Sequence, residues 1–174
     1  MEPLFIDFES YSELSLPDVG SYKYVAHPST EPLLLAYAFG DEDVQVVDLT
    51  RARLPERIIR NVDRGCEVVA HGDFDRLLWN ACINAAKIRL SQYTSTIAMA
   101  VEVALPAKLS ELGKALKLGV AKDPKGKSLI RKFCMPGKDG SRPVWSGLDW
   151  EYFKSYARDD VRVMREAYYQ MPPL

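Results

Sequence analysis

The chain has 174 residues, of which 47% are hydrophobic, and 23 Lys and Arg residues face 24 Asp and Glu residues, for a formal net charge of -1. A chain of this length buries roughly 70% of the surface that its unfolded form exposes, so one domain forms a core without disulfides or a structural metal. Disordered chains, collagens and disulfide scaffolds are excluded. The 3 Cys residues form no CxxC pair and have no His nearby, so we expect free thiols and no zinc site.

Four short apolar runs predict the strands of the fold. Residues 4–8 form an aromatic-rich run, and residues 32–39 and 44–47 flank a turn in the pattern of a hairpin. A further run at residues 67–70 leads into a helical pattern. Because strands come first and then interleave with helices, the sequence predicts an α/β fold with a mixed sheet.

Helical spacing of apolar residues dominates the rest of the chain. It predicts helices over residues 48–63, 73–85, 96–104 and 108–118, and one or two helical turns at 129–135. Asp73 has the position of a helix cap, and residues 121–127 are expected to form a Lys-rich loop. Ser146 and Asp149 have the spacing of a capping box, which predicts a last helix of about 20 residues that ends before Pro172.

No segment of the sequence has the properties of a membrane span or a leader. The first apolar run is interrupted by acidic residues, and no stretch approaches the ~20 apolar residues that cross a bilayer. We therefore expect no signal peptide, no membrane anchor and a cytoplasmic location.

The first strand carries two acidic residues on one face. Asp7 and Glu9 are two positions apart, and strand side chains alternate, so both project from the same side. Neighbouring acids on a buried strand require a compensating partner, typically a metal ion. The alternative is an edge strand with solvated acids. Phe5, Ile6 and Phe8 disfavour that alternative because they make the strand apolar on both faces.

Two further acidic positions lie where a ligand site is expected. The sequence His71-Gly-Asp-Phe-Asp75 runs from a strand end into a helix, and ligands of open α/β sheets bind beyond the carboxyl ends of strands. In isolation, Asp75 is better explained as a partner of the helix dipole. Tyr156 and Asp160 are four positions apart and share one face of the last helix, whereas Asp159 points elsewhere.

Three motifs follow one another in the sequence: D-x-E, an Asp after an aromatic residue that follows a strand-end His, and YxxxD. Their order resembles the DEDD superfamily of 3′-to-5′ exonucleases, in its tyrosine-bearing, DnaQ-like subgroup. Other segments resemble the proofreading exonuclease domain of bacteriophage-type family A DNA polymerases. These are Asp7-Phe-Glu9-Ser, Tyr24-Val-Ala-His-Pro-Ser-Thr30, Leu129-Ile-Arg-Lys-Phe-Cys-Met-Pro136 and the closing Met171-Pro-Pro-Leu174.

The resemblance implies an RNase H-like fold, a five-stranded mixed sheet flanked by helices, whose fifth strand would lie near residues 90–94. It implies that residues 1–171 form a single exonuclease domain and that residues 172–174 begin a linker. A polymerase domain would act with it, in cis or in trans. If the chain is phage-encoded, the cytoplasm would be that of the host.

The resemblance also implies roles for the acidic residues. Asp7, Glu9 and Asp160 would bind one divalent cation, Asp7 would also hold a second, and Asp75 would support the second directly or through water. Tyr156 would position the attacking water. Two Mg²⁺ or Mn²⁺ ions suit this chemistry, since carboxylate oxygens are the ligands that such cations prefer and two ions stabilise both the attacking and the leaving oxygen of a phosphodiester.

The expected substrate is a frayed, single-stranded 3′ end of DNA, whose bases stack on aromatic side chains and are not read by sequence. The candidate substrate contacts are Phe8, Ser10, His71, Phe74, Lys122 and Lys127. The two phenylalanines are more often core residues than contacts. Three other functions remain open: an exonuclease that trims RNA with the same acids, a non-catalytic nucleic-acid clamp, and an RNase H-like nuclease that cuts inside duplexes.

The near-neutral net charge of the whole chain argues against a nucleic-acid partner, but this total hides two oppositely charged parts. Residues 107–142 hold 10 Lys and Arg against 3 Asp and Glu, so this segment carries +7 and the rest of the chain -8. The segment is either a solvated face or a track for phosphates, on which Lys122, Lys125, Lys127 and Lys132 would lie.

Overall fold

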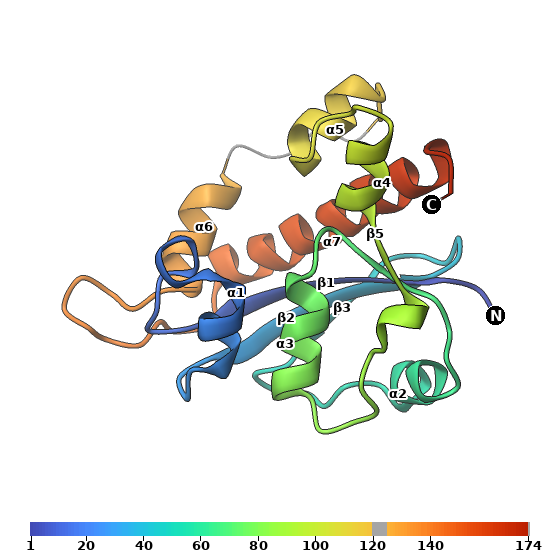
Figure 1. Cartoon of the computed structure of the whole chain (residues 1–174). Coiled ribbons are helices and arrows are strands. Elements are labelled where there is room, and N and C mark those ends of the chain that lie inside the picture. Colours follow the sequence, from blue (N-terminus) through green and yellow to red (C-terminus); the bar gives the residue numbers. More distant parts are fainter. Residues whose placement is uncertain (120–124, 174) are drawn as a thin grey trace.

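In this computed structural model, which describes residues 1–119 and 125–173, five strands form one sheet in the order β3-β2-β1-β4-β5 (Figure 1). The strands are β1 (Leu4–Tyr11), β2 (Glu31–Phe39), β3 (Gln45–Asp48), β4 (Val68–Ala70) and β5 (Tyr93–Ser95). The pairs β1-β2 and β2-β3 are antiparallel, whereas β1-β4 and β4-β5 are parallel. The predicted α/β class and mixed sheet are confirmed, and the expected fifth strand is β5.

Helices cover both faces of this sheet. They are α1 (Leu16–Ala26), α2 (Glu56–Asp63), α3 (Phe74–Cys82), α4 (Thr96–Glu102), α5 (Leu109–Ala115), α6 (Gly126–Phe133) and α7 (Leu148–Gln170), with a short 3-10 helix at Leu90–Gln92. Helices α1 and α3 pack side by side, and α4, α5 and α6 contact α7, which lies along β1, β2 and β3 (Figure 1).

The alternation of β1 decides what each face of the sheet contains. Phe5 packs edge-to-face on Tyr168 of α7, with ring centres 5.3 Å apart, so the side of β1 that carries Phe5, Asp7 and Glu9 faces α7. On the neighbouring strand, Ala36 lies opposite Asp7. A small side chain at that position leaves room for α7 above the first acidic residue.

Two helices begin away from their predicted start, α3, α4 and α5 end earlier than predicted, and one helix was not predicted. Helix α2 begins at Glu56 and not at residue 48, because Asp48 still belongs to β3. Helix α6 begins at Gly126, so part of the expected Lys-rich loop is helical. Helix α1 was not predicted, because only Tyr24 of its residues is buried and Gly20, with φ of 75°, interrupts the helical backbone.

Neither expected capping side chain makes a capping hydrogen bond, although Asp73 lies at the N-cap position of α3. Asp73 makes no capping bond, and its carboxylate pairs with Arg76 at 2.8 Å. Helix α7 is capped by Gly147, whose φ of 84° suits a residue without Cβ, and not by Ser146. Asp149 pairs instead with a lysine of α6. A capping motif in the sequence therefore predicts the region in which a helix begins, but not which group caps it.

Cys66, Cys82 and Cys134 are free thiols, as expected. In the part of the chain that the structure describes, no helix has both the length and the apolar character that a membrane span requires.

A partly buried carboxylate fastens the start of α7 to the sheet. At the end of β3, Asp48 accepts a hydrogen bond of 2.8 Å from Nε1 of Trp150, a fully buried side chain, and pairs with Lys154 at 3.2 Å. Burial alone would raise the pKa of Asp48, but hydrogen bonds from Thr50, Trp150 and Lys154 outweigh it and lower this pKa.

We expect Asp48→Asn to lower the free energy of unfolding by about 1–3 kcal/mol at neutral pH, because hydrogen bonds to a charged group contribute about that much. The pKa of Asp48 is depressed in the folded chain, so its contribution is present above the ordinary value of 3.8 and is lost as the pH falls through the lowered pKa. Denaturant unfolding of both proteins should show a difference that narrows in acid. An equal difference at neutral and acid pH would contradict a role for the charge.

Candidate metal centre

Three carboxylates from distant parts of the chain meet between β1 and α7. Asp7 and Glu9 come from β1 and Asp160 from α7, and each offers an oxygen within 4.8 Å of the others. Glu9 and Asp160 are buried, whereas Asp7 is partly exposed. Like charges this close repel strongly in a buried setting, and a hard divalent cation with oxygen ligands compensates such a group. The predicted pairing of the D-x-E strand with the last helix is therefore present in the fold.

Asp75 reaches the same strand from its open edge. β4 pairs with β1 only through Leu4 and Phe5, and beyond that point the Oδ1 of Asp75 accepts a hydrogen bond of 2.8 Å from the backbone N–H of Phe8. Phe8 is the residue between Asp7 and Glu9. Burial raises the pKa of Asp75 to about 7, against the opposing effect of the Phe8 bond. Among the described residues, the group of oxygens within 4.8 Å does not include Asp75.

Tyr156 lies one helical turn before Asp160. Its ring stacks on Phe153 with centres 6.0 Å apart and an angle of 11° between the planes. Burial raises the pKa of the Tyr156 hydroxyl above its usual value, and the carboxylates of Asp160 and Glu9 raise it further. The phenol therefore stays protonated at neutral pH and acts as a hydrogen-bond donor, not as a base.

Helix α6 contacts the site at both of its ends. A Cβ added to Gly126 would lie 2.7 Å from Cζ of Tyr156, a separation that real Cβ atoms do not adopt. Just past the other end, Sγ of Cys134 lies 4.0 Å from Oε2 of Glu9, and its backbone oxygen accepts the N–H of Ser12 at 3.3 Å. Sequence reasoning missed Gly126 and Cys134 as parts of this site, because Gly126 lies in no motif and the segment Leu129–Pro136 that holds Cys134 carries no candidate ligand.

The aromatic and hydroxyl residues that were predicted as substrate contacts lie in packed positions. Phe8 is only 5% exposed and packs edge-to-face on Trp79. The half-buried ring of Phe74 meets Tyr24 edge-to-face, with centres 5.6 Å apart, and the Tyr24 hydroxyl lies 3.1 Å from that of Ser10. Packing explains these side chains, and contact with a substrate stays a prediction for them.

The remaining predicted contacts are one histidine and two lysines. Nδ1 of His71 lies 2.8 Å from Oγ1 of Thr96, which fixes its ring at the end of β4. Lys122 lies outside the described residues. The backbone of Lys127 lies in α6, but its side chain is outside the part of the chain that the structure describes.

The sequence of the chain is similar to that of a phage DNA polymerase. No protein-family model matches the chain. The chain is 34% identical over 176 residues to a DNA polymerase of Bacillus phage SP02, a match that covers 95% of this chain and 27% of the polymerase. The chain thus spans about a quarter of the length of the polymerase that it matches. This similarity indicates a polymerase-related origin.

We expect Gly126→Ala to destabilise the chain by about 1–3 kcal/mol, the usual effect of overpacking, because the new methyl group must displace the Tyr156 ring. Alanine favours a helix by about 1 kcal/mol, so the clash has to exceed that gain. Gly119→Ala is the matched control, since a Cβ there meets nothing within 4 Å. Urea unfolding measures both variants. A Gly126→Ala variant as stable as the parent would contradict the close packing of α6 on Tyr156.

Saturation with Mg²⁺ or Mn²⁺ should raise the melting temperature relative to EDTA, because a ligand at 100 times its dissociation constant stabilises by about 2.7 kcal/mol. Asp160→Asn removes a carboxylate from the group and should abolish this shift. Asp159→Asn is the control, because Asp159 pairs with Arg162 at 2.9 Å and lies outside the group. Equal metal-dependent shifts in the two variants would refute a metal centre at Asp160.

Proposed function

We propose that this chain is a metal-dependent 3′-to-5′ exonuclease of the DEDD type that removes nucleotides from single-stranded or frayed DNA ends. The observation that carries the proposal is the convergence of Asp7, Glu9 and Asp160 within 4.8 Å, on two elements that the sequence separates by about 150 residues. Asp75 accepts a hydrogen bond from β1, and Tyr156 lies on α7 one turn before Asp160. Similarity to a phage DNA polymerase supports a proofreading role and DNA as the partner.

The donor set fits two Mg²⁺ or Mn²⁺ ions. All of the proposed ligands are carboxylates, which hard cations prefer over nitrogen or sulfur donors. Asp7, Glu9 and Asp160 would hold the first ion, while Asp7 would also hold the second, which Asp75 would support directly or through water. Bound there, the ions would stabilise negative charge on the attacking and leaving oxygens of the phosphodiester.

The protein groups around the ions have separable tasks. The Tyr156 hydroxyl keeps its proton at neutral pH and hydrogen-bonds with Asp160, and at this place it would position the attacking water. The bond from Phe8 N–H to Asp75 fixes the position of a carboxyl group whose pKa burial raises to about 7 despite that bond. The thiol of Cys134, whose pKa burial raises, stays protonated beside Glu9.

The mixed five-stranded sheet with helices on both faces supports an RNase H-like fold for residues 1–171. We propose that residues 172–174 begin a linker, and that a polymerase domain works with this domain in cis or in trans. If the chain is phage-encoded, as its relative is, it would act in the cytoplasm of the host.

The direct test is digestion of a 5′-labelled single-stranded DNA, read as a ladder. The parent chain should shorten it stepwise with Mg²⁺ or Mn²⁺ and not with EDTA. Asp7→Ala should lose nearly all activity, and Asp159→Asn should keep it, while both retain the circular dichroism of the parent. Substantial metal-dependent hydrolysis by Asp7→Ala would overturn the assignment.

Two substrates separate this function from its alternatives. A 3′-blocked oligonucleotide should resist digestion, whereas internal cuts would identify an endonuclease. A matched RNA oligonucleotide should be degraded more slowly than the DNA, and a preference for RNA would identify an RNA-trimming enzyme. Binding without hydrolysis of either nucleic acid would identify a clamp.

A further inference from the structure

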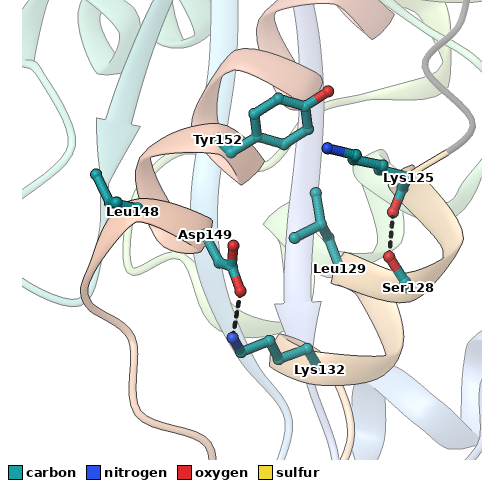
Figure 2. A pocket seen from close by; sticks show the side chains of 7 residues that line it. All are labelled: Lys125, Ser128, Leu129, Lys132, Leu148, Asp149 and Tyr152. Carbon is teal, nitrogen blue, oxygen red and sulfur yellow. Dashed lines mark hydrogen bonds and ion pairs between the residues drawn. The ribbon is translucent and has the colours of Figure 1, made fainter.

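A pocket of about 540 Å³ lies between α6 and the first turns of α7, outside the carboxylate group (Figure 2). Lys132 of α6 and Lys125, which directly precedes α6, line it on one side, while Leu148, Asp149 and Tyr152 line it from α7. Its volume lies within the range of small-molecule sites. Nothing in the proposed chemistry uses these side chains, so the pocket needs a separate explanation.

The pocket combines positive charge with an aromatic surface. Lys132 pairs with Asp149, and both side chains are more than half exposed, so the pair is weak and a competing anion can replace it. Nζ of Lys125 lies 5.3 Å from the ring centre of Tyr152, which is 37% exposed. Leu148 is 91% exposed, although it is a large apolar side chain. Lysines beside an exposed aromatic ring are the pattern with which proteins bind single-stranded nucleic acid.

The position of the pocket relative to the carboxylates limits which nucleotide it can take. Tyr152 and Tyr156 are four residues apart on α7, which is one helical turn and about 6 Å along the axis. Lys125 directly precedes Gly126, the residue that packs on Tyr156. The pocket therefore adjoins the site, one turn towards the start of α7. Beyond the single terminal nucleotide on its 3′ side, a strand whose 3′-terminal linkage lies at the carboxylates continues only in the 5′ direction.

We propose that this pocket binds a nucleotide of the same strand on the 5′ side of the cleaved linkage, with its base on Tyr152 and its phosphate between Lys125 and Lys132. The inference rests on the proposed function for the direction of the strand. Asp149 leaves Lys132 for solvent when the phosphate binds. Binding at this position is sequence-independent, because every base offers a face to the ring.

The test is binding, and it does not require hydrolysis. Fluorescence anisotropy with 5′-labelled (dT)8 in EDTA should show Tyr152→Leu weakened by about 5- to 150-fold, the range of base stacking on one aromatic side chain. Tyr152→Phe, which keeps the ring, should bind as the parent does. Tyr152→Leu should bind an abasic oligomer of the same length as well as the parent, because no base is present to stack.

The contribution of the two lysines is measured by the salt dependence of DNA binding. The double variant Lys125→Gln, Lys132→Gln should flatten the slope of log K against log salt by about 0.7, since the two lysines share one phosphate and each neutralised phosphate of a single strand contributes about 0.7. Lys114→Gln in α5 is the control, because Lys114 is an exposed lysine of the same basic segment and does not line the pocket. Its slope should equal that of the parent.

Unchanged (dT)8 affinity in Tyr152→Leu and an unchanged salt slope in the double lysine variant would overturn the pocket proposal, even where the parent digests DNA as an exonuclease. Oligoglutamate bound as tightly as (dT)8, with no dependence on Tyr152, would overturn it in favour of a site for acidic peptides. A Tyr152→Leu variant that loses affinity for (dT)8 but not for the abasic oligomer would support the pocket proposal, even where the parent chain hydrolyses nothing.

Discussion

The packing of α7 on β1 is the constraint on which the rest of the site depends. Charge repulsion among Asp7, Glu9 and Asp160 opposes this contact, and apolar packing on either side maintains it. On one side Phe5 meets Tyr168, and on the other the start of α7 is fastened to β3 through Trp150 and Asp48. A rigid helix held at both ends brings a carboxylate to a fixed place above the strand.

Helix α6 extends this constraint to the residues around the acids. Its Phe133 packs on both Trp150 and Phe153, with ring centres 5.0 and 5.5 Å away, and Phe153 in turn stacks on Tyr156. Gly126 at its start permits the close approach to Tyr156. The same helix therefore positions the tyrosine on one side and presents the lysines of the pocket on the other. Movement of α6 would change both properties together.

The parts of the site that local patterns carry were predictable from the sequence. Asp7 and Glu9 alternate within an apolar strand, and Tyr156 and Asp160 have helical spacing, so the faces that they share follow from geometry alone. Gly126 and Cys134 were not predictable, since their roles arise from contacts with residues far away in the chain. Helix α1 was missed for a related reason: it is held by tertiary contacts such as Tyr24 with Phe74 and has no apolar face of its own.

A crystal grown with Mn²⁺ tests the metal centre most directly, through the anomalous scattering of the ion. The strongest anomalous peak is expected among the carboxylate oxygens of Asp7, Glu9 and Asp160, with a second peak near Asp75. Both peaks should be absent from a crystal of Asp7→Ala grown in the same way. Well-ordered carboxylates without an anomalous peak among them, in the parent chain at saturating Mn²⁺, would contradict the assignment of these acids as metal ligands.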